Sequence, residues 1–225
     1  MINKLPKWVE VGGFLLAFNA GFINAVGLLG FKHQAVSHLT GTSTFLSLAI
    51  TNSNFPEITH LLLVMVSFIL GAAYSGLVIG NTALKLGRHY SAALLTESAL
   101  LFIAMYMLNH GSLTGHFFAS AACGLQNAMT SAYSGAVVRT THVSGLFTDL
   151  GAALGLRLRG HKTDSRKIVL YSILISGFVV GGIAGSWLFA KLIFTAILVP
   201  CMLTAVIAIG YWVFLHHREV DNPGN

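Results

Sequence analysis

The chain has 225 residues, of which 55% are hydrophobic and only 9% are charged, and its formal net charge is +6. A soluble globular domain has roughly a quarter of its residues charged. The composition therefore excludes an ordinary soluble protein and predicts an all-α fold, that of a polytopic membrane protein. No polar linker or low-complexity tract divides the chain, so residues 1–225 are interpreted as a single membrane domain.

Six long apolar segments follow one another along the chain, each near the ~20 residues that a membrane helix needs. They cover residues 8–30, 61–83, 92–108, 117–138, 168–189 and 193–215. The first begins like a signal peptide, but its apolar stretch continues past Phe31, so it is expected to stay in the fold as a membrane helix. Two shorter and more polar segments, residues 37–50 and 141–156, are expected to be half-helices that do not span the bilayer.

The two halves of the chain carry matching motifs in the same order. The pairs are AGFINAVG (20–27) with CGLQNAMT (123–130), SHLTGTSTFL (37–46) with THVSGLFTDL (141–150) and, more weakly, FILGAAYSG (68–76) with FVVGGIAGS (178–186). Single glycine matches are common in membrane helices, but two co-linear motifs that each contain an aligned Asn or His are not. The pattern predicts an internal duplication, with repeats at about residues 8–108 and 115–215.

Lysine and arginine are concentrated in some loops and absent from others. The N-terminus, the loop around Lys85, the loop from Arg157 to Lys167 and the C-terminus are basic, whereas residues 51–60 and 109–116 contain neither. Because basic loops stay in the cytoplasm, the basic cluster is interpreted as a topology signal and not as a nucleic-acid site. The consistent scheme has six transmembrane helices and both termini in the cytoplasm. Each half then crosses three times, which inverts the second repeat relative to the first.

In this scheme the two short segments enter and leave the bilayer by the same face. Irregular backbone at membrane depth is tolerated only where it is buried in protein or lines a wet cavity. Ser37 and Thr141 are good N-cap residues and are expected to begin the two half-helices. The half-helix N-termini, each with a partial positive charge, would then meet near the middle of the membrane.

Four sequence stretches, GFINAVG, HLTGTST, GLQNAM and RTTHVSGLFTDLG, together resemble the YoaK family of small bacterial inner-membrane proteins. The resemblance covers nearly the whole chain, and RTTHVSGLFTDLG is its most specific part. It implies a polytopic helical protein of the bacterial inner membrane. It implies no activity, because that family is uncharacterised.

The polar residues around the two breaks are the candidate substrate-binding residues. They are Asn24, His38, Thr40, Gln126, Asn127, Arg139, His142, Ser144 and Asp149. The two histidines either bond the exposed backbone at the breaks or line a permeation path. The two asparagines likewise either satisfy broken backbone or contact a solute.

Three of these candidates occur only in the second half. Gln126 is aligned with Ile23, and Asp149 is aligned with Phe45, so Gln126 is a candidate for selectivity in one half. Arg139 and Asp149 either form an interfacial ion pair, or Arg139 acts with the helix N-termini as an electrostatic filter that attracts anions.

Glu97 is the lone acid of its apolar segment. An ionisable group inside a membrane helix is a functional candidate. Glu97 is therefore a candidate for proton coupling; the alternative is that it lies near the cytoplasmic face and pairs with Arg88.

These patterns favour an inner-membrane transporter of a small polar or anionic solute that binds between the repeats near the midplane. Glu97 and the two histidines would allow proton coupling. The alternatives are a passive channel and a structural or sensory membrane protein without a substrate. An enzyme is not expected, because no nucleophile motif and no metal-ligand set is present, and no cofactor or nucleic-acid partner is expected. The expected partners are the lipid bilayer and the solute, and the glycine-rich helix faces permit a homodimer.

Overall fold

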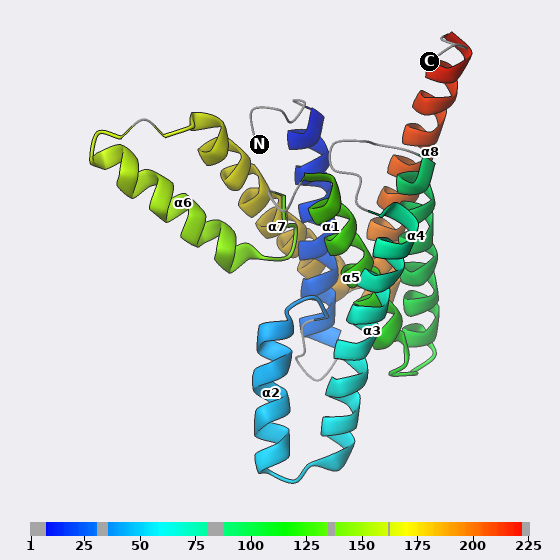
Figure 1. Ribbon diagram of the computed structural model, residues 1–225. Coiled ribbons are helices and arrows are strands. Elements are labelled where there is room, and N and C mark those ends of the chain that lie inside the picture. Colours follow the sequence, from blue (N-terminus) through cyan, green and yellow to red (C-terminus); the bar gives the residue numbers. More distant parts are fainter. Residues whose placement is uncertain (1–7, 31–35, 81–87, 135–137, 162, 222–225) are drawn as a thin grey trace.

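The computed structural model describes residues 8–30, 36–80, 88–134, 138–161 and 163–221, and every regular element within them is a helix (Figure 1). In chain order the elements are α1 (Trp8–Gly30), α2 (Leu39–Thr51), α3 (Phe55–Ile79), α4 (Arg88–Asn109), α5 (Gly115–Ser134), α6 (Val143–Leu158), α7 (Ser165–Leu192), the 3₁₀ helix η2 (Ile193–Ile197) and α8 (Leu198–Asp221). The all-helical prediction is confirmed, and the helical segments expected from the sequence overlap these elements.

Four stretches of the described chain are long and apolar enough to cross a membrane. They are α1, α3, residues His89–Asn109 of α4, and the run Ser165–Phe214. That last run contains α7, η2 and most of α8, and it turns at Ile193, where the backbone has a φ of 49°. The six crossings expected from the sequence also include α5, whose polar side chains lower its hydropathy, and count α7 and α8 separately.

The longer helices begin and end at residues suited to those positions. At the start of α3 the side chain of Asn54 accepts a hydrogen bond from the backbone N–H of Glu57 (3.4 Å), and a proline occupies the first turn. Asp164 begins α7 in the same way, because its Oδ1 accepts from the backbone N–H of Arg166 at 3.0 Å. Gly80 follows α3 with a φ of 63°, a conformation that glycine adopts without steric cost.

The two short helices lie apart from the main bundle. Among the described helices α2 packs only against α3, and α6 packs only against α7. In Figure 1 both begin near the middle of the molecule, and α2 runs toward the bottom while α6 runs toward the upper left. Each therefore presents its N-terminus to the centre of the molecule, as expected for half-helices.

The expected N-caps of the two half-helices are wrong by one residue. The N-cap positions are His38 for α2 and His142 for α6, and neither side chain caps its helix with a hydrogen bond. The hydroxyl of Ser37 is engaged elsewhere, since it donates to Asn24 Oδ1 at 3.0 Å. The first backbone N–H groups of both half-helices are consequently left without a side-chain cap.

Close helix packing joins the first half of the chain to the second. The main partner of α1 is α7, and the main partner of α3 is α5. At the four most closely packed glycines of these helix pairs, an added Cβ would overlap a backbone carbonyl oxygen of the neighbouring helix. The contacts are Gly21 on Phe178, Gly181 on Phe18, Gly124 on Phe68 and Gly71 on Ala121. Only glycine lets the backbones approach this closely.

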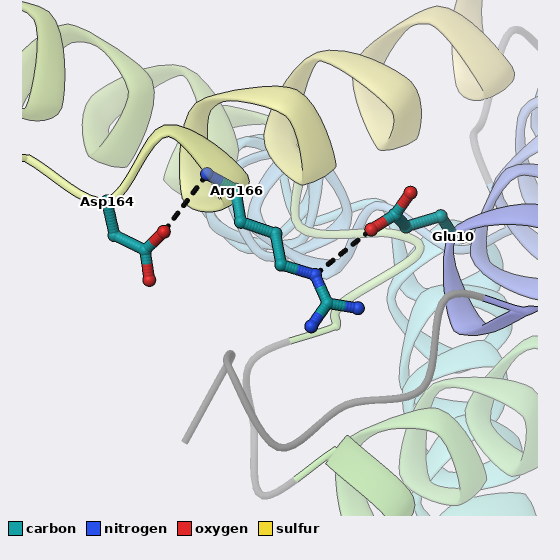
Figure 2. A network of polar contacts seen from close by, with 3 residues as sticks. All are labelled: Glu10, Asp164 and Arg166. Atoms are coloured by element: carbon teal, nitrogen blue, oxygen red, sulfur yellow. Dashed lines mark hydrogen bonds and ion pairs between the residues drawn. The ribbon is translucent and has the colours of Figure 1, made fainter.

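The first turns of α1 and α7 are tied together at one end of the molecule. Figure 2 shows Arg166 donating its Nε–H to Glu10 Oε1 (3.1 Å), next to Asp164, which caps the same helix. Both members of the ion pair are partly exposed, so its contribution to stability is at most about 1 kcal/mol. The pair places the basic loop before α7 at the same end as the start of α1.

Candidate functional site

A cavity of about 510 Å³ lies where the two half-helices approach each other. Its lining comes from α1, the beginnings of α2 and α6, and α7. The lining residues are Asn24, Leu28, His38, Gly41, Thr42, Phe45, Val143, Ser144, Phe147 and Phe178. The polar breaks that sequence matching paired across the two halves therefore share one space.

On the side of the first break, Asn24 connects α1 to the start of α2. The residue is about nine-tenths buried, and its Oδ1 accepts the hydroxyl hydrogen of Ser37 at 3.0 Å. Its Nδ2 group has no hydrogen-bond partner among the described residues, and Asn24 lines the cavity. A free amide donor beside an uncapped helix N-terminus suits a hydrogen-bond acceptor of a ligand.

On the side of the second break, Asn127 connects α5 to the start of α6. Its Nδ2 lies 3.4 Å from His142 Nε2, and its buried Oδ1 has no partner in the described part of the chain. His142 is exposed, and both His38 and Arg139 lie within electrostatic reach of it. The two histidines therefore lie near enough to each other to interact electrostatically.

Of the nine sequence-predicted residues, Asn24, His38 and Ser144 line the cavity. The other six do not belong to the lining: Thr40, Gln126, Asn127, Arg139, His142 and Asp149. Thr40 is exposed, and its carbonyl oxygen accepts the hydroxyl of Thr44 within α2. Asp149 and Arg139 are also exposed, and both lie within electrostatic reach of Tyr171 on α7. Pairing between Arg139 and Asp149 stays a prediction.

Gln126 lies in a separate, fully buried hydrogen-bond network. Its Nε2 donates to the backbone oxygen of Leu16 at 2.9 Å and to Thr140 Oγ1 at 3.1 Å, while its Oε1 accepts from Asn19 Nδ2 at 3.1 Å. Gln126 thus joins α5 to α1 and to the segment that leads into α6. The amide has a defined role in the core, whereas its role in solute selectivity stays a prediction.

Glu97 belongs to the same network. Its side chain is fully buried in the middle of α4, and its Oε1 accepts from Asn19 Nδ2 at 3.0 Å. Arg88 is nine residues earlier on the same helix, roughly 13 Å away along the axis. The carboxyl therefore lies deep in the bundle and not at its end, where the alternative interpretation placed it.

Two residues of the network were missed as candidate site residues, although a signal for one was present. Asn19 is an amide in an apolar helix, and the same reasoning that selected Asn24 applies to it. Asn19 is aligned with Ala122 in the second half, so comparison of the motifs does not select it. Thr140 lies just before the matched segment, where a threonine is common in any loop.

Comparison with known proteins identifies the family of the chain but no individual relative. No curated protein and no solved structure matches the chain at a significant level. A family model matches residues 12–210, which include all nine substrate-binding candidates and Glu97. The chain therefore belongs to the family described as protein of unknown function (DUF1275).

Proposed function

We propose that this protein is a transporter of a small polar or anionic solute in the bacterial inner membrane, and that the cavity between α2 and α6 is its solute site. The observation that carries the proposal is the shared lining, because His38 and Ser144 come from two breaks about a hundred residues apart in sequence and border one cavity. Irregular backbone at membrane depth is accounted for when it borders a wet site of this kind. The resemblance to YoaK proteins is consistent with the same location.

The helix arrangement supports two inverted three-span repeats, at about residues 8–108 and 115–215. The packed glycines occur in matched pairs: Gly21 and Gly124 contact Phe178 and Phe68, which are themselves aligned in the third motif pair. Each repeat would thus insert its first helix against the other repeat's helix at the same depth. Such exchange is the expected result of duplication with inversion.

The directions of the helices support six crossings with both termini in the cytoplasm. In Figure 1 the beginning of α1, the loop between α6 and α7, and the end of α8 all lie toward the upper part of the view. The turn between α2 and α3 and the turn between α4 and α5 lie toward the bottom. The described parts of the basic segments are therefore at one end, and the segments without Lys or Arg are at the other.

The charges around the cavity favour an anion or a neutral polar solute over a cation. Two helix N-termini without side-chain caps face the site, and each attracts negative charge. Arg139 is close to His142, and no Asp or Glu is among the lining residues. Glu97 would supply proton coupling, because an ionisable carboxyl buried in a membrane helix can take up and release a proton during the cycle.

The test is solute flux into liposomes that contain the purified protein, with and without a pH gradient. Ser144→Leu should fill part of the cavity and abolish most of the flux. Thr148→Leu is the matched control, because Thr148 is exposed one turn later on α6, outside the lining. Absence of flux for every small anion and neutral polar solute tried, or equal loss in both variants, would overturn the proposal.

Two other functions, a passive channel and a structural or sensory role, can be distinguished from a transporter with the same purified protein. Solute flux that is the same with and without a pH gradient would identify a passive channel. A structural or sensory role is favoured by one observation, the hydrogen bond between Ser37 and Asn24, which stabilises the break without any solute. If His38→Ala and His142→Ala abolish folding, the polar breaks are structural; folded but inactive variants support the solute path. No catalytic activity and no cofactor is proposed.

A further inference from the structure

The buried network around Glu97 contains two oxygen atoms without partners. Glu97 Oε2 and Asn19 Oδ1 are both buried, and neither has a hydrogen-bond partner in the described part of the chain. They belong to the two side chains that already share the 3.0 Å hydrogen bond from Asn19 Nδ2 to Glu97 Oε1. Two buried acceptors on neighbouring side chains are costly in a dry interior when neither receives a donor.

A single proton on Glu97 gives both oxygen atoms a hydrogen-bond partner. When Glu97 carries a proton on Oε2, that O–H group can donate to Asn19 Oδ1, while Asn19 donates one N–H to Glu97 Oε1. The acid and the amide then form a two-point pair, and the second N–H of Asn19 stays on Gln126 Oε1. The proton comes from water and returns to water, and no covalent bond between heavy atoms changes.

We propose that Glu97 and Asn19 together form a proton-binding site, and that Gln126 couples its occupancy to the start of α6. The coupling follows from the order of the contacts. Asn19 holds Gln126, and Gln126 holds Thr140, which lies two residues before the N-cap of α6. A change in the Asn19 amide on protonation of Glu97 therefore reaches the second break of the cavity.

The surroundings of Glu97 contain no described charged group that would compete for this role. On α5 the neighbouring titratable group is the thiol of Cys123, and on α8 it is Cys201, which bonds Ser98 beside Glu97. On α3 it is Tyr74, which bonds Thr96 instead. The segment η2 contains no titratable residue, and α1 contributes Asn19 itself. Thiols and phenols are uncharged at neutral pH, so the carboxyl is the group that titrates.

The inference rests on the proposed transport function for its biological meaning, but its test needs no solute. Proton binding is measured by infrared difference spectroscopy of the purified protein across a pH titration, as the carbonyl band of a buried protonated carboxylic acid. Glu97→Gln should remove this band. Its persistence in Glu97→Gln would assign the band to another acid and overturn the site.

Coupling is measured as the pH dependence of maleimide labelling at Ser144→Cys, which lines the cavity, with Thr51→Cys at the far end of α2 as the control. We expect the Ser144→Cys labelling rate to change by about fivefold or more with pH, the lower end of typical site-to-site coupling. In Glu97→Gln, which mimics the protonated acid, the rate should stay at its low-pH value. Labelling that keeps its pH dependence in Glu97→Gln contradicts the coupling.

Gln126→Leu separates binding from coupling, because it removes the connection to Thr140 but leaves the pair of Asn19 with Glu97. The infrared band should titrate in this variant, while Ser144→Cys labelling should no longer follow pH. Asn19→Leu should shift the titration of the band, and Asn19→Asp should shift it further, which a merely structural role would not produce. Unchanged titration in both Asn19 variants would overturn its part in the site. If no solute flux is found but the infrared band of Glu97 titrates as expected, the transport function is rejected and the proton-binding site is not.

Discussion

The two breaks are built alike but are surrounded differently. Beside the second break, Asn19 of α1, Gln126 of α5 and Thr140 form a continuous hydrogen-bond chain. The residues at the matched positions around the first break are Ala122, Ile23 and Val36, which lie in a dry hydrophobic cluster with exposed fractions of 0–2%. The two breaks are thus flanked differently, because only the second is connected through Gln126 and Asn19 to the carboxyl of Glu97. A symmetric framework with one asymmetric polar network allows the two sides of a shared cavity to respond differently to protons.

The largest expected effect concerns what the halves share. Gly21→Ala and Gly124→Ala should each destabilise the protein by about 3 kcal/mol or more, and to a similar extent, because each Cβ meets a backbone carbonyl that cannot move aside. Gly155→Ala is the control, since nothing lies near its Cβ and alanine favours a helix. Thermal unfolding in detergent measures all three. Strongly unequal losses at Gly21 and Gly124 would break the likeness between the halves.

The next effect concerns where the halves differ. Ile23→Gln places an amide in a cluster of buried hydrophobic residues and should cost about 2–3 kcal/mol. Gln126→Ile removes one member of a polar network and should cost about 1–3 kcal/mol by leaving Asn19 and Thr140 partly unpaired. Thermal unfolding without denaturant measures the loss of stability in Ile23→Gln and in Gln126→Ile. Neutral behaviour of Ile23→Gln would mean that water reaches the first break.

A smaller effect distinguishes the two asparagines. Asn24 presents a free amide donor to the cavity, whereas Asn127 already bonds His142. Replacing Asn24 by Ala should raise the solute concentration at half-maximal flux about tenfold, because one hydrogen bond to the ligand is lost. Asn127→Ala should mainly affect stability. Equal changes in half-saturation for both variants would show that the two residues contact the solute in the same way.

The smallest effect belongs to the ion pair at the end of the bundle. Glu10→Gln should lower stability by less than about 1 kcal/mol, because both partners are partly exposed and screened by solvent. Unfolding measured at low and high salt should show the difference shrinking as salt is added. A loss that salt does not reduce would mean that the pair is more buried than its exposure indicates.

Much of the architecture could be predicted from the sequence, because apolar length and the matched motifs are local signals. The two half-helices followed from residue spacing and hydropathy, whereas these signals left open whether Glu97 lies deep in the bundle or near the cytoplasmic face. The Asn19–Gln126 bond could not be predicted, since it depends on which faces of α1 and α5 meet across 107 residues of chain. The start of α2 shifted by one residue for a related reason: Ser37 bonds Asn24 on α1, and propensity alone does not include that contact.

The crossed packing of α1 on α7 also has a consequence for biosynthesis. The first helix leaves the ribosome long before Ser165, where its main partner begins. Until then, the surface of α1 that carries Gly21 has lipid or an insertion chaperone as its neighbour. Assembly must therefore be completed after the last third of the polypeptide is inserted, and a truncated first half should be degraded and should not accumulate as a folded half-protein.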